Sequence, residues 1–303
     1  MGHDLFGVLS APVEFELLGR FGVSPVDDHA AVMERLKAAS DGGNHVILPD
    51  LCEVPRRGLV YHLPPTHRIE GDLVCGDEFR RGLGAFILGL FSILYECRLQ
   101  WDGWWHEGYV KSLHYDRVNL LQHDFVPFFE TAIQAWERMD GEAQMLYLQA
   151  LAFHQKANGY AHGFEVFYAD FTALEAIWHF GLRSGEWQPK NPAKPLQGHG
   201  KRLRTMALAL GMLEHDEPAC TNFKAPCEHH KCKAIRLLYK SRNELFHEAA
   251  WGERMGIMSG ALVPPASWIH FFTKRVLIAA LGFRNGFTRS TWESLCPVFS
   301  TWP

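Results

Sequence analysis

The chain lacks the features that mark secreted and membrane-spanning proteins. It has seven cysteines, an odd number, and they are scattered over 303 residues. This distribution argues against a disulfide framework, so we expect the protein in the reducing cytoplasm. The most apolar stretch, Leu83–Tyr95, is too short to cross a bilayer. Met1–Gly22 shows no basic region followed by an apolar run, so we expect no signal peptide and no membrane partner.

Signature motifs of several large enzyme classes are also missing. The chain contains no P-loop, no G-x-G-x-x-G, no G-x-S-x-G and no H-E-x-x-H. These motifs are typical of NTPases, dinucleotide-binding enzymes, α/β-hydrolases and zinc proteases. Internal repeats and low-complexity tracts are absent as well. Function therefore has to be sought in less widespread patterns.

The charge of the chain is small in total but uneven along its length. The formal net charge is −4, so the chain as a whole gives no argument for binding nucleic acid. From Arg183 to Arg242, however, there are twelve Lys and Arg residues and five Asp and Glu residues. This local balance of +7 leaves about −11 for the remainder. A basic segment in an acidic protein indicates either an anionic partner or a solvated helix face, and both remain open.

The hydrophobic pattern predicts an α+β protein that is predominantly α-helical. Residues 1–125 read as a mixed, proline-punctuated region, which we interpret as a sensor or regulatory part, and residues 126–303 as an up-and-down helical bundle. In the first region we expect one helix, Asp28–Ala39, and short strands at Val13–Leu18, His45–Leu48 and Gly58–Leu63.

Helices are expected wherever apolar residues recur at helical spacing. We expect Glu78–Leu99 as one apolar helix, followed by a loop from Trp101 to Tyr115 whose Trp and His rings could stack on bases or pack in a core. A proline-rich linker, Arg183–Gly200, interrupts the later helices. These are Val126–Met139, Glu142–Asn158, Ala161–Leu182, His199–Leu213, Lys233–Ala249 and Ser267–Leu281.

One of these helices carries an arginine where its pattern favours an apolar residue. On Lys233–Ala249, Arg242 falls within the stripe that contains Ile235, Leu238 and Leu245. An arginine that faces a core needs a partner, because an isolated buried charge is very costly.

A carboxylate on another helix has the matching pattern. Glu175 lies inside the apolar stripe of Ala161–Leu182. If the two helices pack together, we expect a buried Glu175–Arg242 pair, since the guanidinium fork suits a bidentate carboxylate contact. The alternative is that the end of one stripe is exposed and no pair forms.

His247 lies on a different face of the same helix as Arg242. It follows Arg242 by five residues, about 140° around the helix, and Asn243 lies one turn before His247 on the same face. Asn243 could therefore orient the imidazole at a surface groove or a dimer interface. The alternative is a solvated or helix-capping histidine.

The run Arg242-Asn243-Glu244-Leu245-Phe246-His247 resembles the R-x4-6-H signature of HEPN domains (higher eukaryotes and prokaryotes nucleotide-binding). The helices around it are similar too: Phe167–Phe180, with Glu175, resembles the family's upstream helix and Phe271–Phe283 its final helix. The likeness covers roughly residues 135–285. The whole chain also resembles HEPN proteins of unestablished function, some of them labelled as methylamine-utilisation accessory proteins.

The resemblance implies a ribonuclease that needs no metal cofactor and acts as a homodimer, with two motifs forming one composite site. In such a site the ribose 2′-OH attacks the adjacent phosphate, and His247 is the general acid and base. Arg242 stabilises the phosphorane charge, and Asn243 positions the histidine or the phosphate. The substrate is RNA, because DNA lacks the 2′-OH.

Within the family, such enzymes include toxins and defence effectors, so an antitoxin or regulatory protein is an expected partner. Other HEPN proteins bind without cutting. The alternative function is therefore a non-catalytic module that binds a nucleotide, RNA or a protein. A third interpretation is that Glu175 and Arg242 only hold the bundle together.

Weaker candidates lie near the motif helix. Lys201, Arg202, Arg204 and Lys240 could bind the RNA backbone by charge, or they could line solvated helix faces. A dense group of thiols and imidazoles could hold a structural zinc ion, although it lacks the paired C-x2-C of strong zinc sites. Otherwise it is a polar loop with free thiols. Its members are Cys220, Cys227, His229, His230 and Cys232.

Overall fold

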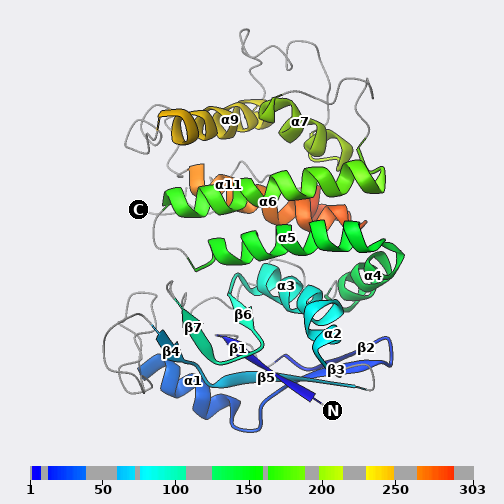
Figure 1. The fold of residues 1–303 in the computed structure, drawn as a ribbon, viewed down its shortest axis with the longest axis vertical. Coiled ribbons are helices and arrows are strands. Elements are labelled where there is room, and N and C mark those ends of the chain that lie inside the picture. Colours follow the sequence, from blue (N-terminus) through cyan, green and yellow to red (C-terminus); the bar gives the residue numbers. More distant parts are fainter. Residues whose placement is uncertain are drawn as a thin grey trace. The chain divides into compact units, whose positions relative to one another are not determined.

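The computed structural model describes residues 2–7, 13–38, 60–71, 76–106, 125–159, 163–187, 198–213, 230–248 and 265–289. Helices dominate and a small antiparallel sheet accompanies them (Figure 1), so the expected α+β, predominantly α fold class is confirmed. The chain divides into two compact units. The first is Met1–Glu137 with Asn158–Ala161, and the second is Arg138–Ala157 with His162–Pro303.

The first unit is built on a five-stranded antiparallel sheet in the order β2-β3-β5-β1-β6. Its central strand β5 places Ile69 opposite both Val23 on β3 and His3 on β1. Ile69, Val23 and Leu5 are all buried. Strands β4 and β7 form a separate pair. The strands are β1 (Gly2–Gly7), β2 (Phe15–Leu17), β3 (Phe21–Pro25), β4 (Val60–His62), β5 (Pro65–Gly71), β6 (Leu99–Gln100) and β7 (Trp104–His106).

Helices cover this sheet through aromatic contacts. The α3 helix is buried along most of its length because apolar residues occupy all its faces. The ring of Phe91 on α3 lies 5.6 Å from that of Phe15 on β2 and 4.9 Å from that of Phe129 on α4, between centroids. The helices are α1 (His29–Ala38), α2 (Gly76–Arg81), α3 (Leu83–Tyr95) and α4 (Phe125–Arg138).

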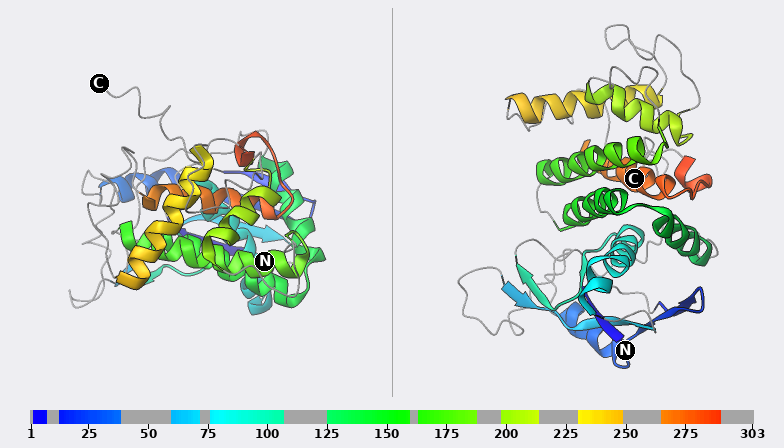
Figure 2. Two further views of the ribbon diagram at one scale, coloured as in Figure 1. Left: turned by 90° about the horizontal axis from the view of Figure 1, so that it is seen from above. Right: turned by 45° about the vertical axis from the view of Figure 1, so that its right-hand side comes forward.

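The second unit is a helical bundle with α6 at its centre. This helix packs against α5 and α11, and also against α7 and α9. Figure 1 shows α6 between α5 and the α7–α9 pair, and the turned view in Figure 2 agrees. The helices are α5 (Gly141–Ala157), α6 (Gly163–Ser184), α7 (His199–Ala209), α9 (His230–Glu248), α11 (Pro265–Ala280) and α12 (Gly286–Arg289).

Apolar residues at helical spacing explain the central position of α6. Phe167, Phe171, Leu174 and Trp178 are all almost fully buried. Full burial of one such side chain contributes about 1.5–3 kcal/mol. This face therefore supplies much of the driving force for the bundle.

Local contacts fix the ends of α5 and α6. Asp140 caps α5, since its Oδ1 accepts a hydrogen bond from the backbone N–H of Ala143 at 2.8 Å. The same carboxylate accepts from Arg183, near the end of α6, at 3.0 Å. Just beyond α6, Trp187 turns back over Gly181, where any Cβ would overlap the indole ring.

Most expected helices are confirmed to within a few residues, but several details of the first unit were wrong. The single helix Glu78–Leu99 is two helices, which break at Gly82 and end at Tyr95, and the loop from Trp101 contains strand β7. Strands β1, β3 and β5 were not expected. The predicted strand His45–Leu48 lies outside the described residues.

The boundary between the units falls after Glu137, somewhat beyond the expected position near residue 125. Among the described helices, none combines the length and the apolar character required for crossing a bilayer.

Candidate functional site

Helix α9 carries the three motif residues near its C-terminal end. His247 is exposed and Arg242 is half-buried. Nη1 of Arg242 lies 3.0 Å from Nε2 of His247 and 3.3 Å from Oδ1 of Asn243. A guanidinium only donates, so Nε2 of His247 accepts, and the imidazole in this arrangement is neutral with its proton on Nδ1. Arg242 therefore links the other two, in place of the expected direct contact between Asn243 and His247.

The expected Glu175–Arg242 pair is wrong. Glu175 is half-buried and binds two residues of α7 instead: Nδ1 of His199 at 2.7 Å, and the guanidinium of Arg202. The reason is that α6 packs against both α7 and α9. Glu175 faces α7, while Arg242 reaches α6 one turn earlier, at Phe171. Among the described residues, no carboxylate contacts Arg242.

Arg242 packs on aromatic rings rather than on an acid. Its Cζ lies 4.7 Å from the ring centre of Phe246 and 5.8 Å from that of Phe171. Phe246 in turn stacks on Tyr168, with ring centres 5.2 Å apart and planes only 12° from parallel. Tyr168 and Phe246 are 51% and 39% exposed. The motif thus borders a pair of solvent-facing, stacked rings.

The predicted RNA-contacting cations have unequal surroundings. Lys201 and Lys240 are exposed, and Lys240 is 3.6 Å from Glu244 on its own helix. Arg202 is engaged by Glu175. Arg204 is buried, and its Nη1 lies 3.5 Å from Sγ of Cys232, so it faces the protein interior. Only the two lysines remain as surface charges for a polyanion.

The predicted zinc ligands lie largely outside the described residues. Cys220, Cys227 and His229 are not described, and of His230 only the backbone is. Cys232 is buried on α9, where its sulfur accepts from Arg204.

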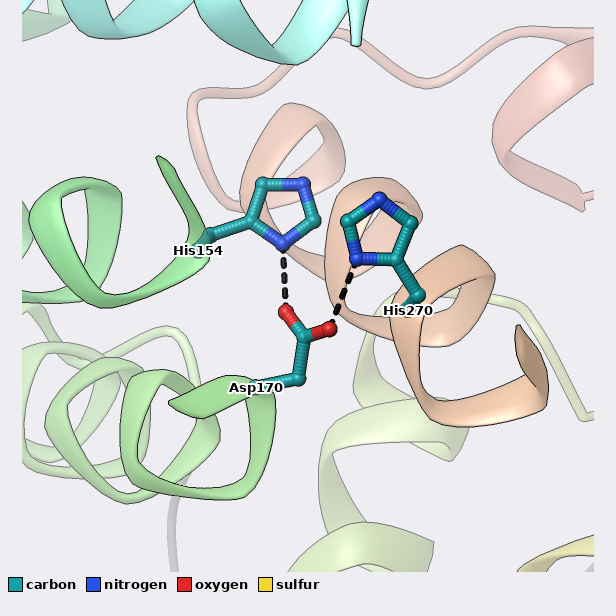
Figure 3. A group of neighbouring side chains, drawn as sticks. All are labelled: His154, Asp170 and His270. Carbon is teal, nitrogen blue, oxygen red and sulfur yellow. Dashed lines mark hydrogen bonds and ion pairs between the residues drawn. The ribbon is translucent and has the colours of Figure 1, made fainter. Parts of the chain in front are cut away.

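A second polar group lies inside the bundle and was not predicted. His154 on α5, Asp170 on α6 and His270 on α11 are all buried, and one potential ligand atom from each lies within 4.8 Å of the others. Oδ1 of Asp170 is 2.5 Å from Nδ1 of His154, and Oδ2 is 2.7 Å from Nδ1 of His270. The two imidazoles are stacked 4.5 Å apart. Figure 3 shows both rings turning Nδ1 toward the carboxylate.

Burial and charge set the protonation of this cluster. Burial would raise the pKa of Asp170, but the two neighbouring imidazoles outweigh it, so that pKa lies below its ordinary value. Burial lowers the pKa of His154 despite the attraction of Asp170, and His270 and Lys274 add to the lowering. These pKa shifts favour an ionised Asp170 and a neutral His154.

A signal for this cluster was present in the sequence. Asp170 lies three residues after Phe167 and four before Leu174, so on a helical wheel it falls between the apolar Leu174 and Ile177, beside the stripe that singled out Glu175. A test for a charge between apolar positions of the wheel selects Asp170 as well. Its two partners come from helices 16 and 100 residues away, and spacing along the chain does not reveal such contacts.

Comparisons of this chain with protein-family models, with curated proteins and with solved structures find no match.

Proposed function

We propose that this chain is a metal-independent endoribonuclease of the HEPN type, which acts as a homodimer on RNA. Its catalytic residues are Arg242, Asn243 and His247. The observation that carries the proposal is the state of Arg242, which lies against the exposed His247 and contacts no carboxylate among the described residues. A guanidinium in this state is available to a phosphate, whereas a pair with Glu175 would have occupied it.

The chemistry follows from these groups. His247 takes the proton from a ribose 2′-OH, O2′ attacks the adjacent phosphorus, and the bond from phosphorus to O5′ breaks. The departing O5′ receives a proton, which a histidine of the second copy supplies. The products are a 2′,3′-cyclic phosphate and a 5′-hydroxyl. Arg242 donates to the phosphoryl oxygens as their charge grows.

The Arg242–His247 hydrogen bond couples binding to activation. In the present arrangement Arg242 occupies the lone pair of Nε2. A phosphate that draws the guanidinium away frees this lone pair, so the base becomes competent as the substrate arrives. Asn243, which also contacts Arg242, positions the guanidinium between the two.

The stacked rings beside the motif support an RNA substrate. Tyr168 and Phe246 present exposed ring surface next to Arg242. Unpaired bases stack on such rings at about 1–3 kcal/mol each, with little dependence on sequence. Single-stranded RNA is therefore the expected substrate.

The test is cleavage of mixed single-stranded RNA by the full chain in EDTA, with DNA of the same sequence alongside. We expect RNA to be cut and DNA to survive. His247→Ala should lower the rate by about 10²–10⁴-fold, while His179→Ala, at an exposed histidine on α6, should not change it. Cleavage that survives His247→Ala, or that stops in chelator while the chain stays folded, would refute the mechanism.

One observation favours a second function, a module that binds RNA without cutting it. If Arg242 keeps the lone pair of His247 Nε2 when RNA is bound, that nitrogen cannot accept the 2′-OH proton. The expected result is then RNA affinity that falls in Arg242→Ala, with no product from a folded dimer. Measuring binding and cleavage on the same samples separates the two functions.

A further inference from the structure

The proposed ribonuclease mechanism involves none of the three residues of the His154–Asp170–His270 cluster. Asp170 lies on α6 next to Phe171, but the two side chains face different neighbours. Asp170 contacts α5 and α11, whereas Phe171 contacts Arg242 on α9. The cluster is therefore a separate candidate site within the same unit.

The hydrogen bonds define which nitrogens of this cluster are available. An ionised carboxylate only accepts, so Nδ1 of each imidazole carries a proton and donates it to Asp170. A neutral imidazole that carries its proton on Nδ1 has its lone pair on Nε2. Figure 3 shows both Nε2 atoms on the side of the rings away from Asp170. His154 Nε2 is buried and has no hydrogen-bond partner among the described residues.

A buried lone pair without a partner costs about 1–3 kcal/mol. His154 Nε2 is such a nitrogen. It lies with His270 Nε2 on one side of a pair of stacked imidazoles (Figure 3), an arrangement that suits a cation binding neutral imidazole. Histidine ligands of metals commonly donate their other ring N–H to a carboxylate, which fixes the tautomer and makes the ligand more basic. One carboxylate here does this for both rings.

Direct ligation by Asp170 does not fit the distances. Two ligands of a tetrahedral zinc ion with bonds of about 2.0–2.1 Å are roughly 3.3 Å apart. The contacts of Asp170 with the two Nδ1 atoms are 2.5 Å and 2.7 Å, which are hydrogen-bond lengths. Asp170 is thus an outer carboxylate, and the Nε2 atoms are the ligands.

We propose that His154 and His270 bind a divalent transition-metal ion of the zinc class through Nε2, with Asp170 orienting both rings. Water or a ligand from outside completes the coordination. Imidazole nitrogen selects zinc, copper or nickel over magnesium and calcium. The positive charge of buried Lys274 opposes the cation, and the charge of Asp170 offsets it. The site is independent of the RNA-cleaving motif.

The test is zinc binding by the full chain, measured as stoichiometry and affinity by calorimetry after removal of metal. We expect His154→Gln and His270→Gln each to lose one equivalent of zinc relative to wild type. Asp170→Asn should weaken that equivalent by about 10–100-fold. His179→Gln, at an exposed histidine of α6, should retain it.

Zinc bound by the group of Cys220, Cys227, His229, His230 and Cys232 must be distinguished from zinc bound by His154 and His270. The variant Cys227→Ser is therefore measured in parallel, and it should keep the equivalent of zinc that depends on His154 and His270. Zinc binding that is unchanged in His154→Gln and His270→Gln overturns the proposal, as does the absence of any binding. If these variants do not fold, X-ray absorption of zinc-loaded Cys227→Ser decides. A spectrum of imidazole and oxygen ligands supports the site, and sulfur ligands or a zinc-free protein refute it.

Discussion

Arg242 and Glu175 are opposite charges on neighbouring helices, yet the structure gives them separate tasks. Glu175 is held by two residues of α7, and Arg242 by aromatic rings and His247. Removing Arg242 should therefore impair chemistry, and removing the charge of Glu175 should impair stability.

We expect Arg242→Ala to lower RNA cleavage by about 10²–10³-fold, as for the loss of one donor to transition-state charge. It should cost only about 0.5–1 kcal/mol of unfolding free energy through the lost ring contact. Glu175→Gln should cost about 1–3 kcal/mol, because two charge-assisted hydrogen bonds weaken, and should leave the cleavage rate of the folded enzyme nearly unchanged. Cleavage assays measure the rate, and denaturant unfolding measures the free energy of unfolding of each variant. The reverse pattern would show that Arg242 is structural.

The apolar stripes of the two helices pointed to Arg242 and Glu175 but could not assign their partners. A charge in an apolar stripe indicates that the residue faces another helix. It does not say which helix, and among the described elements α6 packs against α5, α7, α9 and α11. For this reason Glu175 was matched to Arg242 instead of to α7. Asp170, which lies beside the stripe of α6, was overlooked.

At the level of elements, the long helices and the short strands β2 and β4 were predicted, but strands β1, β3 and β5 were not. Helices α6, α9 and α11 run 22, 19 and 16 residues, so several turns of apolar periodicity accumulate in each. Strands β1, β3 and β5 have 6, 5 and 7 residues. Their alternation covers two or three buried positions, and β5 begins at a proline, which reads as a turn signal.

The cap of α5 gives a pH-dependent prediction. Arg183 and the backbone N–H of Ala143 hold the pKa of Asp140 below its ordinary value of 3.8. A depressed carboxyl pKa stabilises the fold above the unfolded-state pKa, and this contribution disappears as the pH falls through the folded-state pKa.

We expect Asp140→Ala to unfold at a lower temperature than wild type at pH 7. The unfolding temperatures of the two proteins should converge below about pH 3.8. Asp140→Asn should fall between them at pH 7, because asparagine still caps a helix but does not pair with Arg183. Thermal unfolding followed by circular dichroism at several pH values tests this. A constant difference between wild type and Asp140→Ala across the range would contradict the assignment.

The end of α6 depends on Gly181 for a different reason. Trp187 is buried against it and donates from Nε1 to the carbonyl of Trp178 at 2.9 Å. A methyl group at Gly181 would overlap the indole, so Gly181→Ala should destabilise the second unit by about 1–3 kcal/mol through overpacking. Gly185→Ala is a poor control because Gly185 has a φ of +77°. Gly141→Ala, with open space at its Cβ, should change unfolding little by comparison.

For the whole molecule, the uneven charge decides how RNA is attracted. The net charge of −4 repels a polyanion at long range, so binding has to rely on the basic helices. Helix α7 carries three Lys and Arg residues and no acid, and α9 carries five against two glutamates. Within these helices, Lys201 on α7 and Lys240 on α9, two residues before Arg242, are exposed lysines. Each phosphate neutralised on single-stranded RNA contributes about 0.7 to the slope of log affinity against log salt.

Exchanging both lysines for glutamine should therefore lower the salt slope of RNA binding by about 1.4 if each contacts one phosphate. The matched control is Lys37→Gln with Lys156→Gln, exposed lysines on α1 and α5, which removes the same charge elsewhere and should leave the slope within experimental error. Fluorescence anisotropy with His247→Ala, at salt concentrations from 50 to 200 mM, the range over which such contacts weaken strongly, measures the slope without cleavage. Equal slopes in the two double variants would mean that RNA senses only total charge, and the basic face of α7 and α9 would then be a solvated surface.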